Sequence, residues 1–89
     1  MQKQMLVLGR RDHAEAMRVA AGLTIFGHKV RLVFMNGPVA ETPENLEQAE
    51  TLELCDIEPE TTVAGEDLPH LDSHNFALAM IKADAVISL

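Results

Sequence analysis

The sequence predicts one α/β domain in three layers, in which helices cover both faces of a mainly parallel sheet of four or five strands. Two observations lead to this fold class. Short apolar or alternating runs, typical of strands, are separated by longer segments whose apolar residues recur at helical spacing. Strands joined by helices of this length form crossover connections, which make neighbouring strands parallel. With 89 residues, the whole chain from 1 to 89 is expected to be this single domain.

The chain opens with a predicted strand and helix. The apolar run at residues 5–8 is typical of a strand that is buried on both faces. Asp12 is the expected N-cap of a helix over residues 14–26, with Glu15 completing a pair like a capping box, and Gly27 is expected to end it. The candidate core residues of this helix are Ala16, Ala20, Leu23 and Phe26, or Met17, Ala20, Ala21 and Thr24.

A second strand and helix follow. Residues 29–35 form the predicted strand, which an Asn-Gly-Pro turn stops. Thr42 as N-cap and Pro43 at the first helical position predict a helix that ends before Pro59. Its residues expected to face the core are Leu46, Ala49, Leu52 and Cys55.

The last third of the chain predicts a strand, a helix and a closing strand. Residues 61–64 form the expected third strand, and a polar loop follows it. Asp72 or Ser73 is the predicted cap of a helix over residues 75–83. Residues 85–89 form an apolar final strand, whose edge is either covered or available for pairing with another copy.

Composition and charge exclude several classes of function. Fourteen acidic and seven basic side chains give a net charge of -7, whereas nucleic acids and anionic membranes attract basic surfaces. Aromatic residues make up 3% of the chain and include neither Trp nor Tyr, so we expect no base-stacking platform. No apolar run approaches the roughly 20 residues that span a bilayer. The single cysteine allows no internal disulfide and suits a reducing cytoplasm, which is the expected location.

The charges are also segregated along the chain. Eleven of the 14 acidic residues lie between Glu41 and Asp72, and this stretch has neither Lys nor Arg. Five of the eleven recur at every third position, from Glu41 to Glu53. The pattern indicates either a solvated helix surface or a surface that meets a basic partner.

Arg10, Arg11 and His13 follow the first strand and are the candidate anion-binding residues. Ligands of open α/β sheets bind beyond the carboxyl ends of the strands, and a helix N-terminus favours an anion. The chain lacks the glycine-rich patterns of phosphate loops. A small-anion or nucleotide binder is therefore one alternative function, and a solvated turn with a capping Asp12 is the other interpretation of these residues.

Cys55 is the candidate nucleophile of the chain. The neighbouring carboxylates of Glu53, Asp56 and Glu58 disfavour a thiolate, and free cysteines are commonly buried. Core packing is the favoured interpretation, and a reactive thiol is the alternative. We expect the chain to need no cofactor.

His70 and His74 flank Asp72 in an H-x-D-x-H pattern, which makes them candidate metal ligands. Histidines four residues apart lie on the same side of a helix and can share a metal. However, a helix that begins inside this stretch would break the spacing, and a closed zinc site needs further ligands, of which Glu66 or Asp67 is nearest. We predict a loop with two ordinary histidines and no bound metal.

Two stretches of the chain carry a resemblance to a known family. In the first, an alanine-rich helix leads through a G-H-x-V turn at 27–30 and an apolar strand to an N-G-P-V loop at 36–39. The second is an A-D-x-V-I step at 83–87, between the last helix and strand. In these features, over nearly its whole length, the chain resembles the DsrE/DsrF-like family of small sulfur-relay proteins.

The resemblance implies a Rossmann-like domain that assembles into dimers, trimers or hexamers, some of which carry persulfide sulfur. The reactive cysteine of the family usually follows the third strand, where this chain has Ala64, Gly65 and Glu66. Because no cysteine stands there, the chain looks like a non-catalytic assembly or binding subunit linked to intracellular sulfur trafficking, and we expect it not to be an enzyme. The alternative that the resemblance implies is a sulfurtransferase or persulfide carrier that uses Cys55. Its expected partners are further copies of itself and other sulfur-relay proteins.

Overall fold

A computed structural model describes residues 2–65 and 68–89 of the chain. Its four strands are all parallel and form one sheet in the order β3-β2-β1-β4. The strands are β1 (Gln4–Gly9), β2 (Lys29–Phe34), β3 (Glu60–Thr61) and β4 (Ala85–Ser88).

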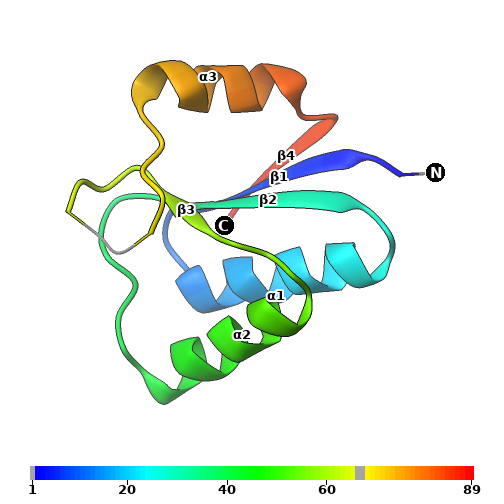
Figure 1. Ribbon diagram of the computed structural model, residues 1–89. Coiled ribbons are helices and arrows are strands. Elements are labelled where there is room, and N and C mark those ends of the chain that lie inside the picture. Colours follow the sequence, from blue (N-terminus) through cyan, green and yellow to red (C-terminus); the bar gives the residue numbers. More distant parts are fainter. Residues whose placement is uncertain (1, 66–67) are drawn as a thin grey trace.

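Helices cover both faces of this sheet, with α1 and α2 on one face and α3 on the other (Figure 1). The helices are α1 (His13–Ile25), α2 (Pro43–Leu54) and α3 (Ser73–Lys82). Each begins at an expected N-cap, because the side chains of Asp12, Thr42 and Asp72 accept a hydrogen bond from the backbone N–H three residues on. The predicted three-layer, Rossmann-like α/β fold is therefore confirmed, with a sheet of four strands.

The two central strands carry the core because their side chains alternate between the faces of the sheet. Leu6, Val7 and Leu8 of β1 are all buried. Val7 packs with Leu32 of β2 on the side of α1 and α2, whereas Leu6 and Leu8 pack on the side of α3. The expectation of a first strand buried on both faces is thus confirmed.

Helix α1 approaches the sheet closely because its inner side is built from small residues. Ala16 and Ala20 are fully buried. At the end of β1, Gly9 makes room for the helix, because a Cβ there would lie 2.9 Å from Cδ1 of Phe34 and 3.2 Å from Cβ of Ala16. A larger residue at Gly9 would push α1 away from the sheet.

Helices α1 and α2 end in the same backbone motif. Gly27 follows α1 at φ +90°, and the N–H groups of Gly27 and His28 donate to carbonyls of the last turn, as in a Schellman motif. The expected C′ glycine is therefore confirmed. Asp56 holds the equivalent place after α2, at φ +57°. Phe26, expected to face the core, instead lies in the turn after α1 and is 83% exposed.

Several of the predicted element bounds are wrong, and those of β1, α1 and β2 are each off by one residue. The third strand is Glu60–Thr61 and not residues 61–64, because the Val63 N–H turns back to Oγ1 of Thr61 at 3.0 Å and does not continue the ladder. Helix α3 begins at Ser73, two residues before the expected start, because Asp72 is the cap. Strand β4 ends at Ser88, one residue short of the expected end.

Candidate functional site

The loop between β1 and α1 holds Arg10 and Arg11 at the carboxyl edge of the sheet. Both side chains are exposed, and with Ser88 and Leu89 they line a hollow of about 240 Å³. The backbone N–H groups of the two arginines donate to the carbonyl oxygen of Leu89, at 2.8 and 2.9 Å. Phosphate-binding loops use backbone N–H groups of this kind to bind their anion. In this chain the two N–H groups already donate to the Leu89 carbonyl oxygen.

His13 is held by β2 and the residue after it. Its ring meets Phe34 edge to face, with 5.1 Å between the ring centroids and 66° between the planes. Its Nε2 lies 3.4 Å from the carbonyl oxygen of Met35, which can only accept a hydrogen. The structure therefore places Arg10 and Arg11 on one hollow, and Arg11 and His13 on a second, shallow hollow of about 450 Å³. Anion binding at these residues stays a prediction.

Cys55 is the C-cap residue of α2, far from the arginines, because α2 ends near the amino edge of the sheet where β3 begins (Figure 1). It is half-buried and packs against the core cluster under α1 and α2. Its N–H lies 3.1 Å from each of the carbonyl oxygens of Thr51 and Leu52. These contacts fit the interpretation of Cys55 as a packing residue, and its reactivity stays a prediction.

The histidines of the H-x-D-x-H pattern do not share a helix. Asp72 caps α3, so His70 lies before the helix and His74 lies in its first turn. In the part of the chain that the structure describes, no three His, Cys, Asp or Glu side chains are grouped to hold a metal ion. Glu66 and Asp67, named as the nearest further ligands, lie outside the described residues.

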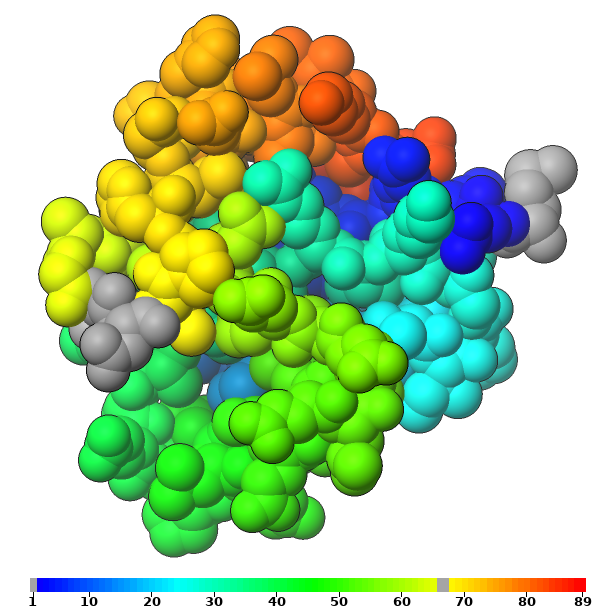
Figure 2. Space-filling view, in the orientation of Figure 1, coloured from blue at the N-terminus to red at the C-terminus, as the bar shows by residue number. Residues whose placement is uncertain are grey.

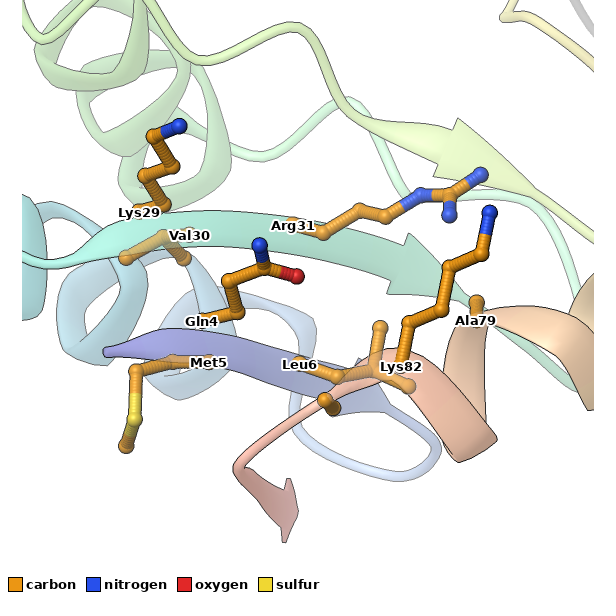
Figure 3. A pocket seen from close by; sticks show the side chains of 9 residues that line it. Gln4, Met5, Leu6, Lys29, Val30, Arg31, Ala79 and Lys82 are labelled. Carbon is orange, nitrogen blue, oxygen red and sulfur yellow. The ribbon is translucent and has the colours of Figure 1, made fainter.

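A hollow on the α3 side gathers basic side chains that sequence reasoning missed. Gln4, Lys29, Arg31 and Lys82 line a space of about 330 Å³ (Figure 3). The guanidinium of Arg31 donates to the carboxylate of Glu60 at 2.6 and 3.0 Å, and this hydrogen bond raises the pKa of Arg31. Alternation along β2 was the available signal, because it puts Lys29 and Arg31 on one face.

A second hollow lies beneath α2 on the opposite side of the sheet, and most of its wall is apolar. Its volume is about 310 Å³, and the buried side chains of Met17, Phe34 and Leu52 line it. Leu46 and Ala49 also line it and are exposed, although both were expected to be in the core. Figure 2 shows this face hollowed between the green spheres of α2 and the yellow spheres of the segment after β3.

The glutamates from Glu41 to Glu53 that recur every third residue are all exposed. Three residues turn an α-helix by about 300°, which is about 60° short of a full turn. Successive glutamates on α2 are therefore displaced by about 60° around the helix axis and spread over its outer half. Glu41 and Glu53 border the apolar hollow. These five glutamates therefore lie on the surface, two of them beside the hollow, and a basic partner for them stays a prediction.

Three of the most exposed large apolar side chains lie at the ends of α1 and α2. Leu54 is 86% exposed, Phe26 is 83% exposed and Ile25 is 76% exposed. The two helices run in the same direction and end on the same side of the molecule (Figure 1). We call Ile25, Phe26 and Leu54 the helix-end patch. Among the described residues, none of the helices has the length and apolar character needed to span a bilayer.

Comparisons with known proteins do not assign the chain to a family. A scan against protein-family models and searches of curated proteins and of solved structures found no match. The resemblance to the DsrE/DsrF-like family therefore rests on the patterns at residues 27–30, 36–39 and 83–87.

Proposed function

We propose that this chain is a small, non-catalytic assembly or binding subunit of the DsrE-like type, linked to intracellular sulfur trafficking. The helix-end patch carries the proposal. Covering a large apolar side chain stabilises a protein by roughly 1.5–3 kcal/mol, and exposed apolar side chains that gather on one side of a molecule mark interaction surfaces. A chain of 89 residues also has a small core, so association adds stability that the single chain lacks.

The first partner that we propose is another copy of the chain. Sedimentation equilibrium between about 10 μM and 1 mM tests this, because weak assemblies dissociate within that range. We expect the mass to rise above 9.8 kDa with concentration. The double substitution Ile25→Asp with Leu54→Asp should abolish that rise, because each adds a charge to an exposed apolar position. A constant monomer mass at every concentration contradicts the proposal.

The alternative of a persulfide carrier is favoured by one observation: Cys55 is half-buried and not sealed in the core. Intact-mass spectrometry after incubation with a persulfide donor separates the two functions. A non-catalytic subunit gains no sulfur under conditions that load a control thiol. A gain of one sulfur atom that a reductant reverses, and that Cys55→Ser abolishes, would instead assign the carrier function.

A further inference from the structure

Independently of self-association, we infer that the hollow lined by Lys29, Arg31 and Lys82 binds a small organic phosphate. Its volume of about 330 Å³ lies at the lower end of the range of small-molecule pockets and leaves room for an organic group beside the phosphate. Three of the seven basic residues of the chain line it, although the net charge of the chain is -7. Cations that share one hollow repel one another, and a bound anion relieves that repulsion.

The side chains that line the hollow come from three elements and supply hydrogen-bond donors. Figure 3 shows the polar ends of Gln4, Lys29 and Arg31 on the same side of β1 and β2. Lys82 lies in the last turn of α3, where it also offsets the negative end of the helix dipole. Glu60 accepts from Nε and Nη2 of Arg31, so that pair leaves both hydrogens of Nη1 free to donate. These donors suit a phosphate monoester, which has three acceptor oxygens and about 1.5 to 2 negative charges.

The carboxylates near the hollow do not cancel its positive charge. Glu58, Glu60 and Asp84 are the acidic residues of the adjoining segments, and in the described part of the chain none of them lines the hollow. Glu60 is engaged by Arg31, and Asp84 accepts the N–H of Gln4 at 2.7 Å on the side of β1 that faces β4. The glutamates of α2 lie on the opposite face of the sheet (Figure 1). Charges farther away than about 8 Å are screened at physiological ionic strength.

The floor of the hollow suits the organic part of the ligand. Leu6 of β1 and Ala79 of α3 line it between the charged side chains, and the aliphatic stems of the two lysines add further CH₂ groups. Apolar contact adds affinity in proportion to the area that it covers. Phenyl phosphate should therefore bind more tightly than inorganic phosphate, and equal binding of the two would contradict an organic ligand.

Titration of ¹⁵N-labelled protein with phenyl phosphate, followed by ¹H–¹⁵N NMR spectra, tests the inference. We expect saturable shifts of the side-chain amide of Gln4 and of the backbone amides of Arg31 and Ala83. Lys29→Gln and Lys82→Gln each remove one cation at an exposed position and should weaken binding about threefold to tenfold. Gln4→Glu keeps the shape of the side chain, adds a carboxylate to the hollow and should weaken binding further.

The matched controls are Arg10→Gln and Arg11→Gln, which remove the same charge at the opposite edge of the sheet. Both should bind phenyl phosphate as the wild type does. Loss of binding in these controls, with binding kept in Lys29→Gln and Lys82→Gln, would overturn the inference and place the anion at the loop between β1 and α1. Absence of saturable shifts up to about 20 mM phenyl phosphate would also overturn it.

Sedimentation equilibrium of Lys29→Gln and Lys82→Gln keeps this test separate from the proposed function. Neither lysine belongs to the helix-end patch, so both variants should associate as the wild type does. A wild type that binds phenyl phosphate and stays monomeric would support the phosphate site while contradicting the proposed assembly. A wild type that associates and binds no phosphate would do the reverse.

Discussion

The two faces of the sheet are covered in different ways. Under α1 and α2, nine of the described residues form one buried apolar cluster, whereas the cluster under α3 has five. Alanines bring α1 close to the strands on the first face. On the second face, part of β2 and β3 is covered by the ion pair of Arg31 and Glu60. The stability of the domain is therefore concentrated on the α1 and α2 side.

The same contrast extends to the surface. The side with the larger core also carries the helix-end patch and the apolar hollow. The α3 side carries the basic hollow around Lys29 and Lys82, and the exposed large apolar side chains of α3 are Leu78, Met80 and Ile81, of which only Ile81 is more than half exposed.

The largest expected effect separates the two cores. Leu32→Ala, at a side chain with 0% exposure in the larger cluster, should lower the free energy of unfolding by about 4 kcal/mol. Leu71→Ala, at 5% exposure in the smaller cluster, should cost about 2 kcal/mol, because its surroundings can close over the space. Urea unfolding at one protein concentration measures both, and equal losses would remove the distinction between the faces.

A second prediction concerns the close approach of α1 to the sheet. Gly9→Ala should destabilise the protein by about 1–3 kcal/mol, because the added Cβ would lie 2.9 Å from Phe34. Gly22→Ala, on α1, is the control, because an added Cβ there meets nothing within 4 Å. The control should stabilise by about 0.5–1 kcal/mol. Thermal unfolding distinguishes them, and a loss in both variants would contradict the packing argument.

A third prediction compares the ends of α1 and α2, which share a motif but differ at the residue with positive φ. Asp56→Gly should stabilise by roughly 0.5–1 kcal/mol, since it relieves a left-handed conformation and removes a carboxylate from a helix C-terminus. Gly27→Ala should destabilise by about 1 kcal/mol for the opposite reason. If Asp56→Gly is destabilising, Asp56 has a contact beyond its place in the turn.

The smallest expected effects come from the ion pairs on the two faces. Glu60→Gln should cost up to about 1 kcal/mol, since its side chain is only 19% exposed. Glu15→Gln should cost less, because Glu15 and Arg18 are more exposed. Arg18 donates to the carboxylate and lowers the pKa of Glu15. That stabilisation is present above the unfolded pKa and is lost as the pH falls through the lowered pKa of Glu15, so wild type and Glu15→Gln should converge in thermal midpoint as the pH is lowered.

Much of the fold was predictable because its signals are local. The apolar run of β1 and the caps at Asp12 and Thr42 each depend on a few neighbouring residues, and all lie where expected. The exposure of Phe26 and Leu46 was not predictable. Helical spacing predicts which side of a helix each residue lies on. Whether that residue is buried depends also on where the helix ends and on whether another element packs against it.

The candidate sites were harder to predict because they depend on contacts between distant segments. The carbonyl oxygen of Leu89 accepts hydrogen bonds from the N–H groups of Arg10 and Arg11 because β4 pairs with β1. No local sequence pattern predicts that pairing. The apolar hollow likewise forms where α2 and the segment after β2 meet the sheet. By contrast, the broken spacing of His70 and His74 was predictable from the cap at Asp72.

We propose that the α1 and α2 side of the molecule, and not the α3 side, carries the surface for self-association. Two-dimensional ¹H–¹⁵N NMR spectra over a dilution series test this proposal, because they show which amides sense the second copy. We expect concentration-dependent shifts at residues 25–29 and around Glu53, with α3 unchanged. Shifts confined to α3 or to β4 would contradict the claim and place the interface on the opposite face or at the sheet edge.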